Sequence, residues 1–143
     1  MSVAGHRLDV LAVIAAGGVL GAEARYGVGV LLPHAADAWP WSTLLINVSG
    51  CVAIGVLMVV ITELVDAHPL VRPFFGVGLL GGYTTFSTAT VEALTLMLAG
   101  RPGAAVGYLV ATPTLAVLGC ALGVVATRLL AGRPPHPPAV ATR

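Results

Sequence analysis

Four long apolar stretches constrain this chain more than any other feature. Each exceeds the roughly 20 mostly apolar residues that an α-helix needs to cross a bilayer. Pro33, Pro40, Pro69 and Pro102 fall in the short connections between them, where proline breaks no helical hydrogen bond. The stretches run over approximately residues 8–32, 41–62, 70–98 and 104–130. We therefore predict an all-α membrane protein with four transmembrane helices, in which consecutive helices are antiparallel neighbours.

The composition supports a membrane environment. Charged residues make up 9% of the 143 positions and hydrophobic residues 57%, whereas an average soluble domain has about 25% charged residues. The net charge of +1, without a basic cluster, argues against nucleic acid as a partner. We expect one transmembrane unit, residues 1–130, followed by a disordered proline-rich tail, residues 131–143.

Glycines are spaced for close packing between these helices. Gly17 and Gly21 share one face of the first stretch, and Gly119 and Gly123 share one face of the fourth. In lipid, small residues let helix backbones approach closely, and packing drives their association. Four spans bury few polar groups by themselves, so we expect an oligomer.

The arginines predict the orientation in the membrane. The amino-terminal segment, the second connection and the tail hold Arg7, Arg72, Arg128, Arg133 and Arg143. The connections on the opposite side hold only Arg101. Because cytoplasmic segments carry an excess of positive charge, both ends of the chain are predicted to face the cytoplasm.

The sequence GGYTTFSTAT, residues 81–90, interrupts the third stretch. Four glycines lie within residues 76–82, and each disfavours a helix by about 1 kcal/mol relative to alanine in water. We predict that the third helix is broken near its middle, with the first half ending near Gly81 and the second beginning near Thr84. Such a break is stable in lipid only where protein or a water-filled cavity satisfies the freed backbone groups. Free N–H groups of the second half would favour anions, and free carbonyls of the first half would favour cations.

Polar residues after the break predict the lining of a polar passage through the membrane. Thr85, Thr88, Glu92 and Thr95 follow one another at intervals of three or four residues, so they share one helix face. A hydroxyl stripe that ends at a carboxylate suits a polar passage better than a lipid face. The alternative is structural, since threonine hydroxyls can bond back to the carbonyl one turn earlier.

Three further polar residues lie within the predicted spans. Asn47 can offer two amide donors to a ligand or join two helices, and the sequence leaves both interpretations open. Arg25 and Glu23 can pair, or Arg25 can stand either at the membrane interface or at the mouth of an anion route. Cys51 and Cys120 lie in apolar runs without metal-ligand spacing, so apolar packing is expected of them.

The same segments resemble a known family. GGYTTFSTATVE, preceded by GVGL, is similar to the signature of the Fluc (CrcB) family of fluoride ion channels. GGVLGAEARYGVG resembles that family's first span, STLLINVSGCVAIG its second and, more loosely, YLVATPTLAVLGCALG its fourth. The resemblance extends over about residues 10–127.

The resemblance implies an architecture and a function. Members are antiparallel dimers of four-helix subunits with two narrow pores, which conduct fluoride passively out of the cell across the cytoplasmic (inner) membrane and protect against its toxicity. A structural sodium ion lies at the dimer centre on backbone carbonyls, which in this chain would be those of Gly81 and Thr84. The implied partners are fluoride, sodium, the lipid bilayer and a second subunit.

The resemblance also assigns pore positions. Phe86 matches the first of two pore phenylalanines, Asn47 a pore-lining asparagine and Arg25 the basic residue of the first span. Hydroxyls and the electropositive edges of aromatic rings suit a dehydrated anion, and several weak sites permit both entry and exit. The other implied pore residues are Thr85, Ser87, Thr88, Thr90, Glu92 and Thr112.

One position departs from the family pattern. The second phenylalanine, three residues after the first, is replaced by Ala89. In addition, antiparallel dimers of identical chains should show little arginine bias, because copies insert both ways. The two departures lead to the hypothesis of a heterodimer in which a paralogous chain supplies the missing ring.

Three other classes of protein fit the sequence less well. The runner-up is a small multidrug-resistance-type exporter of cations, in which Glu23 would be the proton-exchanging carboxylate, but the GGYTTFST break has no role there. A membrane subunit without transport activity is the third interpretation. An enzyme is least favoured, because the sequence contains no evident nucleophile–base pair or metal cluster.

Overall fold

The computed structural model describes residues 3–132, and all regular structure in that range is helical. The predicted all-α class is therefore confirmed. The elements are α1 (Val3–Leu31), α2 (Trp41–Val59), the π-helix η1 (Val60–Leu64), the π-helix η2 (Arg72–Leu80), α3 (Gly81–Tyr83), α4 (Ser87–Leu98) and α5 (Pro102–Leu130). In the chain, η1 continues α2 and α3 continues η2.

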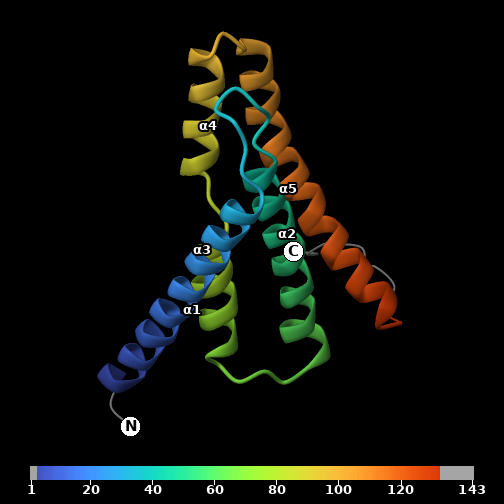
Figure 1. Ribbon diagram of the computed structural model, residues 1–143. Coiled ribbons are helices and arrows are strands. Elements are labelled where there is room, and N and C mark those ends of the chain that lie inside the picture. The colour runs from blue at the N-terminus through green and yellow to red at the C-terminus, as the bar shows by residue number, and fades with distance from the viewer. Residues whose placement is uncertain (1–2, 133–143) are drawn as a thin grey trace, which may run out of the picture.

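The helices pack in two groups that meet near the middle of the molecule (Figure 1). α1 lies along η2 and α3, whereas α2 lies along α5, and α4 packs on α5. The connections from α1 to α2 and from α4 to α5 lie at one end of the molecule. The start of α1, the connection from η1 to η2 and the end of α5 lie at the other end.

Glycines bring the helices of each group into backbone contact. A methyl group on Gly17 would lie 2.9 Å from the Leu79 nitrogen, and one on Gly78 would lie 2.7 Å from the Ile14 carbonyl oxygen. Between α2 and α5, a methyl group on Gly55 or Gly123 would collide with the facing backbone. The predicted packing role is confirmed for Gly17 and Gly123, and Gly55 of α2 and Gly78 of the third stretch have the same role.

Two helical segments are long and apolar enough to cross a membrane, Trp41–Leu64 and Pro102–Leu130. Large apolar side chains also face outward along the helices, including Leu31, Leu98 and Leu130. Both features fit a membrane protein, in which lipid covers such side chains.

The third predicted stretch forms two helical segments, residues 72–83 and 87–98, and Thr84 between them is extended (φ −75°, ψ 158°). The first segment ends at Tyr83 rather than near Gly81, and the second begins at Ser87 rather than near Thr84. Gly78 and Gly82 stay helical because they serve the close contact with α1. The predicted disordered tail includes residues 133–143, which lie outside the described residues.

Candidate functional site

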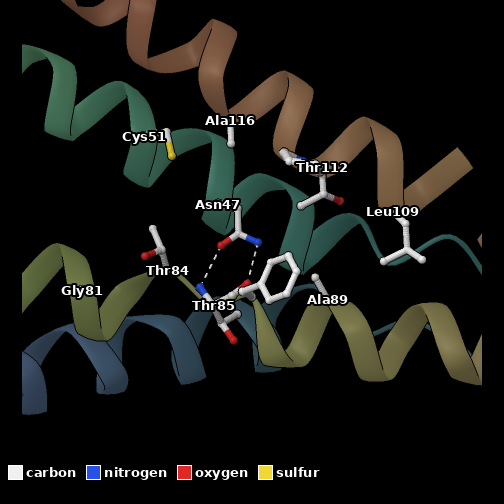
Figure 2. Close-up of a pocket in the computed structure, with 11 residues that line it drawn as sticks. Asn47, Cys51, Gly81, Thr84, Thr85, Ala89, Leu109, Thr112 and Ala116 are labelled. Atoms are coloured by element: carbon white, nitrogen blue, oxygen red, sulfur yellow. Dashed lines mark hydrogen bonds between the residues drawn. The ribbon is translucent and has the colours of Figure 1, made fainter. Parts of the chain in front are cut away.

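The site begins at the non-helical residues between α3 and α4, which Asn47 of α2 holds in place (Figure 2). The Thr85 N–H donates to Asn47 Oδ1 at 2.8 Å, and Asn47 Nδ2 donates to the Thr85 carbonyl at 2.8 Å. Both residues are buried. One carboxamide thus satisfies two of the backbone groups that lose their helical partners here, each of which would cost about 1–3 kcal/mol if left unpaired.

The backbone carbonyls before α4 form a possible cation site. In a continuing helix the Thr85 N–H would bond the Gly81 carbonyl, but it donates to Asn47 instead. A methyl group on Gly81 would meet nothing within 4 Å, so no other part of the described chain packs against its Cα. The Thr84 carbonyl accepts a hydrogen bond from Arg25 Nη1 at 3.3 Å and keeps a second lone pair. Two carbonyl oxygens with free lone pairs fit part of the oxygen shell that a hard cation such as sodium requires.

Thr85 also caps α4. Its Oγ1 accepts a hydrogen bond from the Thr88 N–H at 3.1 Å and donates to Thr88 Oγ1 at 2.9 Å. Ser87 Oγ lies 3.4 Å from the same oxygen. A threonine before a helix that binds the third N–H after it is a common N-terminal cap. The cap leaves the Thr88 hydroxyl proton free to turn toward a ligand.

Two grooves extend from this point. The first has a volume of about 390 Å³ and runs between the α3–α4 junction, α2 and α5. Phe86 lines it with a side chain that is 77% exposed. The other predicted residues that line it are Gly81, Thr84, Asn47, Thr85 and Thr112, together with Ala89.

The second groove has a volume of about 540 Å³ and opens beside the connection between α1 and α2. Arg25, Thr88 and Glu92 line it, as predicted residues of the passage, together with His34. Thr85 lines both grooves, so this residue lies between them. Ser87 and Thr90 line neither groove.

Glu92 lies at the centre of a hydrogen-bond network that sequence reasoning missed. Its carboxylate accepts hydrogen bonds from Thr43 Oγ1 at 2.7 Å and from the Tyr108 hydroxyl at 2.7 Å. His34 Nε2 lies 3.7 Å away. Helical spacing could have identified Thr43, one turn before Asn47, and Tyr108, one turn before Thr112. His34 had no such signal, because it belongs to a connection.

Some of the predicted hydroxyls have the structural role that was the alternative interpretation. Thr90 Oγ1 donates to the Phe86 carbonyl, Thr112 Oγ1 to the Tyr108 carbonyl and Thr84 Oγ1 to the Leu80 carbonyl. Because these bonds engage the hydroxyl protons, the three threonines would have to rotate before donating to an anion. The donors that remain for a ligand in the two grooves are at Asn47, Thr88 and Arg25.

Comparison with known proteins agrees with this arrangement. Residues 12–124 match the family described as CrcB-like protein, Camphor Resistance (CrcB). The match includes α2, the α3–α4 junction and most of α5, which together build the first groove.

Individual relatives are similar over most of the chain. Fluoride-specific ion channel FluC 2 of Streptomyces avermitilis is 53% identical over 103 residues, which are 72% of this chain and 65% of that protein. Fluoride-specific ion channel FluC 1 of Streptomyces coelicolor is 50% identical over 83% of this chain and 77% of its own length. Fluoride-specific ion channel FluC 2 of Nocardia farcinica is 48% identical over 86% of this chain and 88% of its own length. The chain therefore belongs to the CrcB-like family.

Proposed function

We propose that this chain is a subunit of a fluoride-selective channel that lets fluoride leave the cell passively across the cytoplasmic membrane and so protects against its toxicity. The observation that carries the proposal is the Asn47-held junction at Thr85, where two grooves meet. The names of the three relatives, each a fluoride-specific ion channel, support the choice of ion. No step of this function requires catalysis.

The geometry supports a route for a small dehydrated anion. Residues 72–83 and 87–98 would be the two halves of one broken membrane span, whose second half presents its positive N-terminal end inside the bilayer. Thr88 and the second Nδ2 hydrogen of Asn47 can replace the water that fluoride loses, while Arg25 attracts anions to the second groove. The edge of the Phe86 ring adds a weak electropositive contact that allows the ion to leave.

The functional unit is proposed to be an antiparallel dimer. The carbonyls of Gly81 and Thr84 would supply half of a sodium shell, completed by the same carbonyls of a second subunit. Sodium would neutralise the converging carbonyl dipoles and hold the two broken helices together. This role is structural and adds no chemistry to the passage of fluoride.

The second subunit is proposed to be a paralogous chain. Ala89 lines the first groove opposite Asn47 and is 3% exposed, so this subunit offers a small side chain where its family offers a second ring. A phenylalanine from a partner could enter the open groove and complete the aromatic pair. The numbered names of the relatives, FluC 1 and FluC 2, fit the existence of more than one such chain.

The exporter alternative gains no support from the site. Glu23, which would exchange protons in that scheme, is exposed on α1 and lines neither groove. The only carboxylate in the second groove is Glu92, and Thr43 and Tyr108 already donate to it.

Ion flux from liposomes tests the proposed function. The chain is reconstituted with a second CrcB-like chain of the same organism, and efflux is measured from vesicles loaded with fluoride or with chloride. Fluoride efflux well above chloride efflux is the expected result. Proton-driven ethidium movement would instead favour the exporter, and neither signal would favour a non-transporting subunit.

A further inference from the structure

The Thr85 N–H has two possible acceptors, and its choice decides whether the Gly81 carbonyl is free. In a continuing helix it would donate to the Gly81 carbonyl. In the structure it donates to Asn47 Oδ1 at 2.8 Å. The Asn47 side chain, which belongs to a different helix, therefore controls a backbone carbonyl that it does not contact.

The same side chain also fixes the hydroxyl between the grooves. Asn47 Nδ2 donates to the Thr85 carbonyl at 2.8 Å, so Asn47 binds both the N–H and the carbonyl of the Thr85 backbone. We call this pair of hydrogen bonds the clamp. The clamp places Thr85 Oγ1 within 2.9 Å of Thr88 Oγ1 and 3.1 Å of the Thr88 nitrogen. One carboxamide thus leaves the Gly81 carbonyl without its helical donor and holds Thr85, a residue that lines both grooves.

We infer that Asn47 is a positioning residue that couples the sodium site to the fluoride passage by keeping the Gly81 carbonyl free of helical hydrogen bonding. This inference rests on the proposed function for the identity of the two ions. It differs from a simple lining role, in which Asn47 would contact fluoride and have no effect on sodium.

Two substitutions separate the two halves of the clamp. Asn47→Leu removes both bonds, so the Thr85 N–H returns to the Gly81 carbonyl and sodium binds more weakly. Asn47→Asp keeps an acceptor for the Thr85 N–H and loses the donor to the Thr85 carbonyl. It therefore leaves Gly81 free and sodium binding at least as strong as in the native chain, while fluoride flux falls. Thr112→Val is the matched control, because Thr112 lines the same groove but its hydroxyl bonds to its own helix.

The Gly81 carbonyl can be observed directly. The sequence contains two glycine pairs, Gly17–Gly18 and Gly81–Gly82. In a chain with ¹³C-carbonyl, ¹⁵N-labelled glycine, only the first residue of such a pair couples its labelled carbonyl to a labelled nitrogen, which gives two carbonyl resonances by NMR. The labelled chain is reconstituted as for the flux assay, and sodium replaces potassium at constant ionic strength. The Gly17 resonance is the internal control.

The expected result is a sodium-dependent shift of the Gly81 resonance with a midpoint that rises about tenfold in Asn47→Leu. The midpoint should stay near native in Thr112→Val and should not rise in Asn47→Asp. Asn47→Ala, which also lacks both bonds, replaces Asn47→Leu if that variant does not fold. An equal midpoint in the native chain and in Asn47→Leu or Asn47→Ala would overturn the inference, as would a Gly81 resonance that does not respond to sodium. Failure of fluoride selectivity alone would instead overturn the proposed function, because this readout does not measure flux.

Discussion

Phe86 is an apolar residue that packing within the described part of the subunit leaves exposed. It lies directly before α4, lines the first groove and leaves 77% of its surface exposed. Phe86→Ile removes the electropositive ring edge but keeps an apolar side chain. We predict that it lowers fluoride flux by about tenfold or more, since each tenfold corresponds to about 1.4 kcal/mol in the barrier.

The control for Phe86→Ile is Val91→Ile, on the outer surface of α4, where the side chain is 62% exposed. Flux through this variant should equal that of the native chain. Equal flux in Phe86→Ile and Val91→Ile, measured in the same vesicles, would remove Phe86 from the passage.

Tyr108 stabilises the subunit through Glu92. Its ring is fully buried and its hydroxyl donates to Glu92 at 2.7 Å. Tyr108→Phe leaves the carboxylate with one donor fewer in a partly buried position, so we predict a loss of about 1–3 kcal/mol in the free energy of unfolding. Thermal unfolding in detergent micelles measures the effect, and Tyr26→Phe, at a tyrosine that is 71% exposed, should leave the midpoint unchanged.

At this scale the sequence identifies which residues are polar within the membrane, but not which of their donor and acceptor atoms remain without a partner in the protein. Asn47 and Glu92 are predictable because a polar group in an apolar run needs a partner or a ligand. The clamp on Thr85 and the donors to Glu92 are not predictable, because they join residues 38, 49 and 16 positions apart. Those distances are set by helix packing, which a single sequence does not give.

Among the elements, α1 and η2 pack closely at Gly17 of α1. An added methyl group would clash there, whereas one on the neighbouring Gly18 would not. On Gly17 it would lie 2.5 Å from the Phe74 carbonyl oxygen, whereas on Gly18 it would meet nothing within 4 Å. We predict that Gly17→Ala destabilises the subunit by about 1–3 kcal/mol, because α1 must move away from η2. Gly18→Ala should be neutral or stabilise by about 0.5–1 kcal/mol, through its better helix propensity.

Thermal unfolding of Gly17→Ala and Gly18→Ala in the same detergent measures the difference in stability between the two variants. A lower midpoint for Gly18→Ala than for Gly17→Ala would contradict the packing of α1 on η2. The comparison needs no flux measurement, so it tests the fold independently of the proposed function.

The length of an apolar stretch predicts where a membrane-spanning helix lies better than it predicts where such a helix is interrupted. The segments Trp41–Leu64 and Pro102–Leu130 agree with their predicted stretches to within a few residues. The third stretch does not show its break at its glycines, because low helix propensity in Gly78 and Gly82 is offset by close packing against α1. The helix stops where Asn47 offers the Thr85 backbone an alternative partner.

At the scale of the whole molecule, one end of the fold holds more arginines than the other. Arg7, Arg72 and Arg128 belong to the end that holds the start of α1, the η1–η2 connection and the end of α5 (Figure 1). Arg128 is paired there with Glu63 at 2.6 Å. Arg101 belongs to the opposite end, where it contacts the Asp37 carbonyl. Such a bias predicts that every copy of the chain inserts with the same orientation.

We therefore predict that the chain inserts into the membrane of cells in a single orientation, and this prediction tests the proposal of a paralogous partner. In a background of Cys51→Ala and Cys120→Ala, single cysteines are placed at the exposed positions Ala36→Cys, between α1 and α2, and Asp66→Cys, between η1 and η2. A membrane-impermeant maleimide added to intact cells should label Ala36→Cys almost completely and Asp66→Cys only after the membrane is opened. Labelling of about half of each variant in intact cells would mean that the chain inserts both ways. It could then form antiparallel dimers with itself, and the arginine bias would no longer require a second kind of chain.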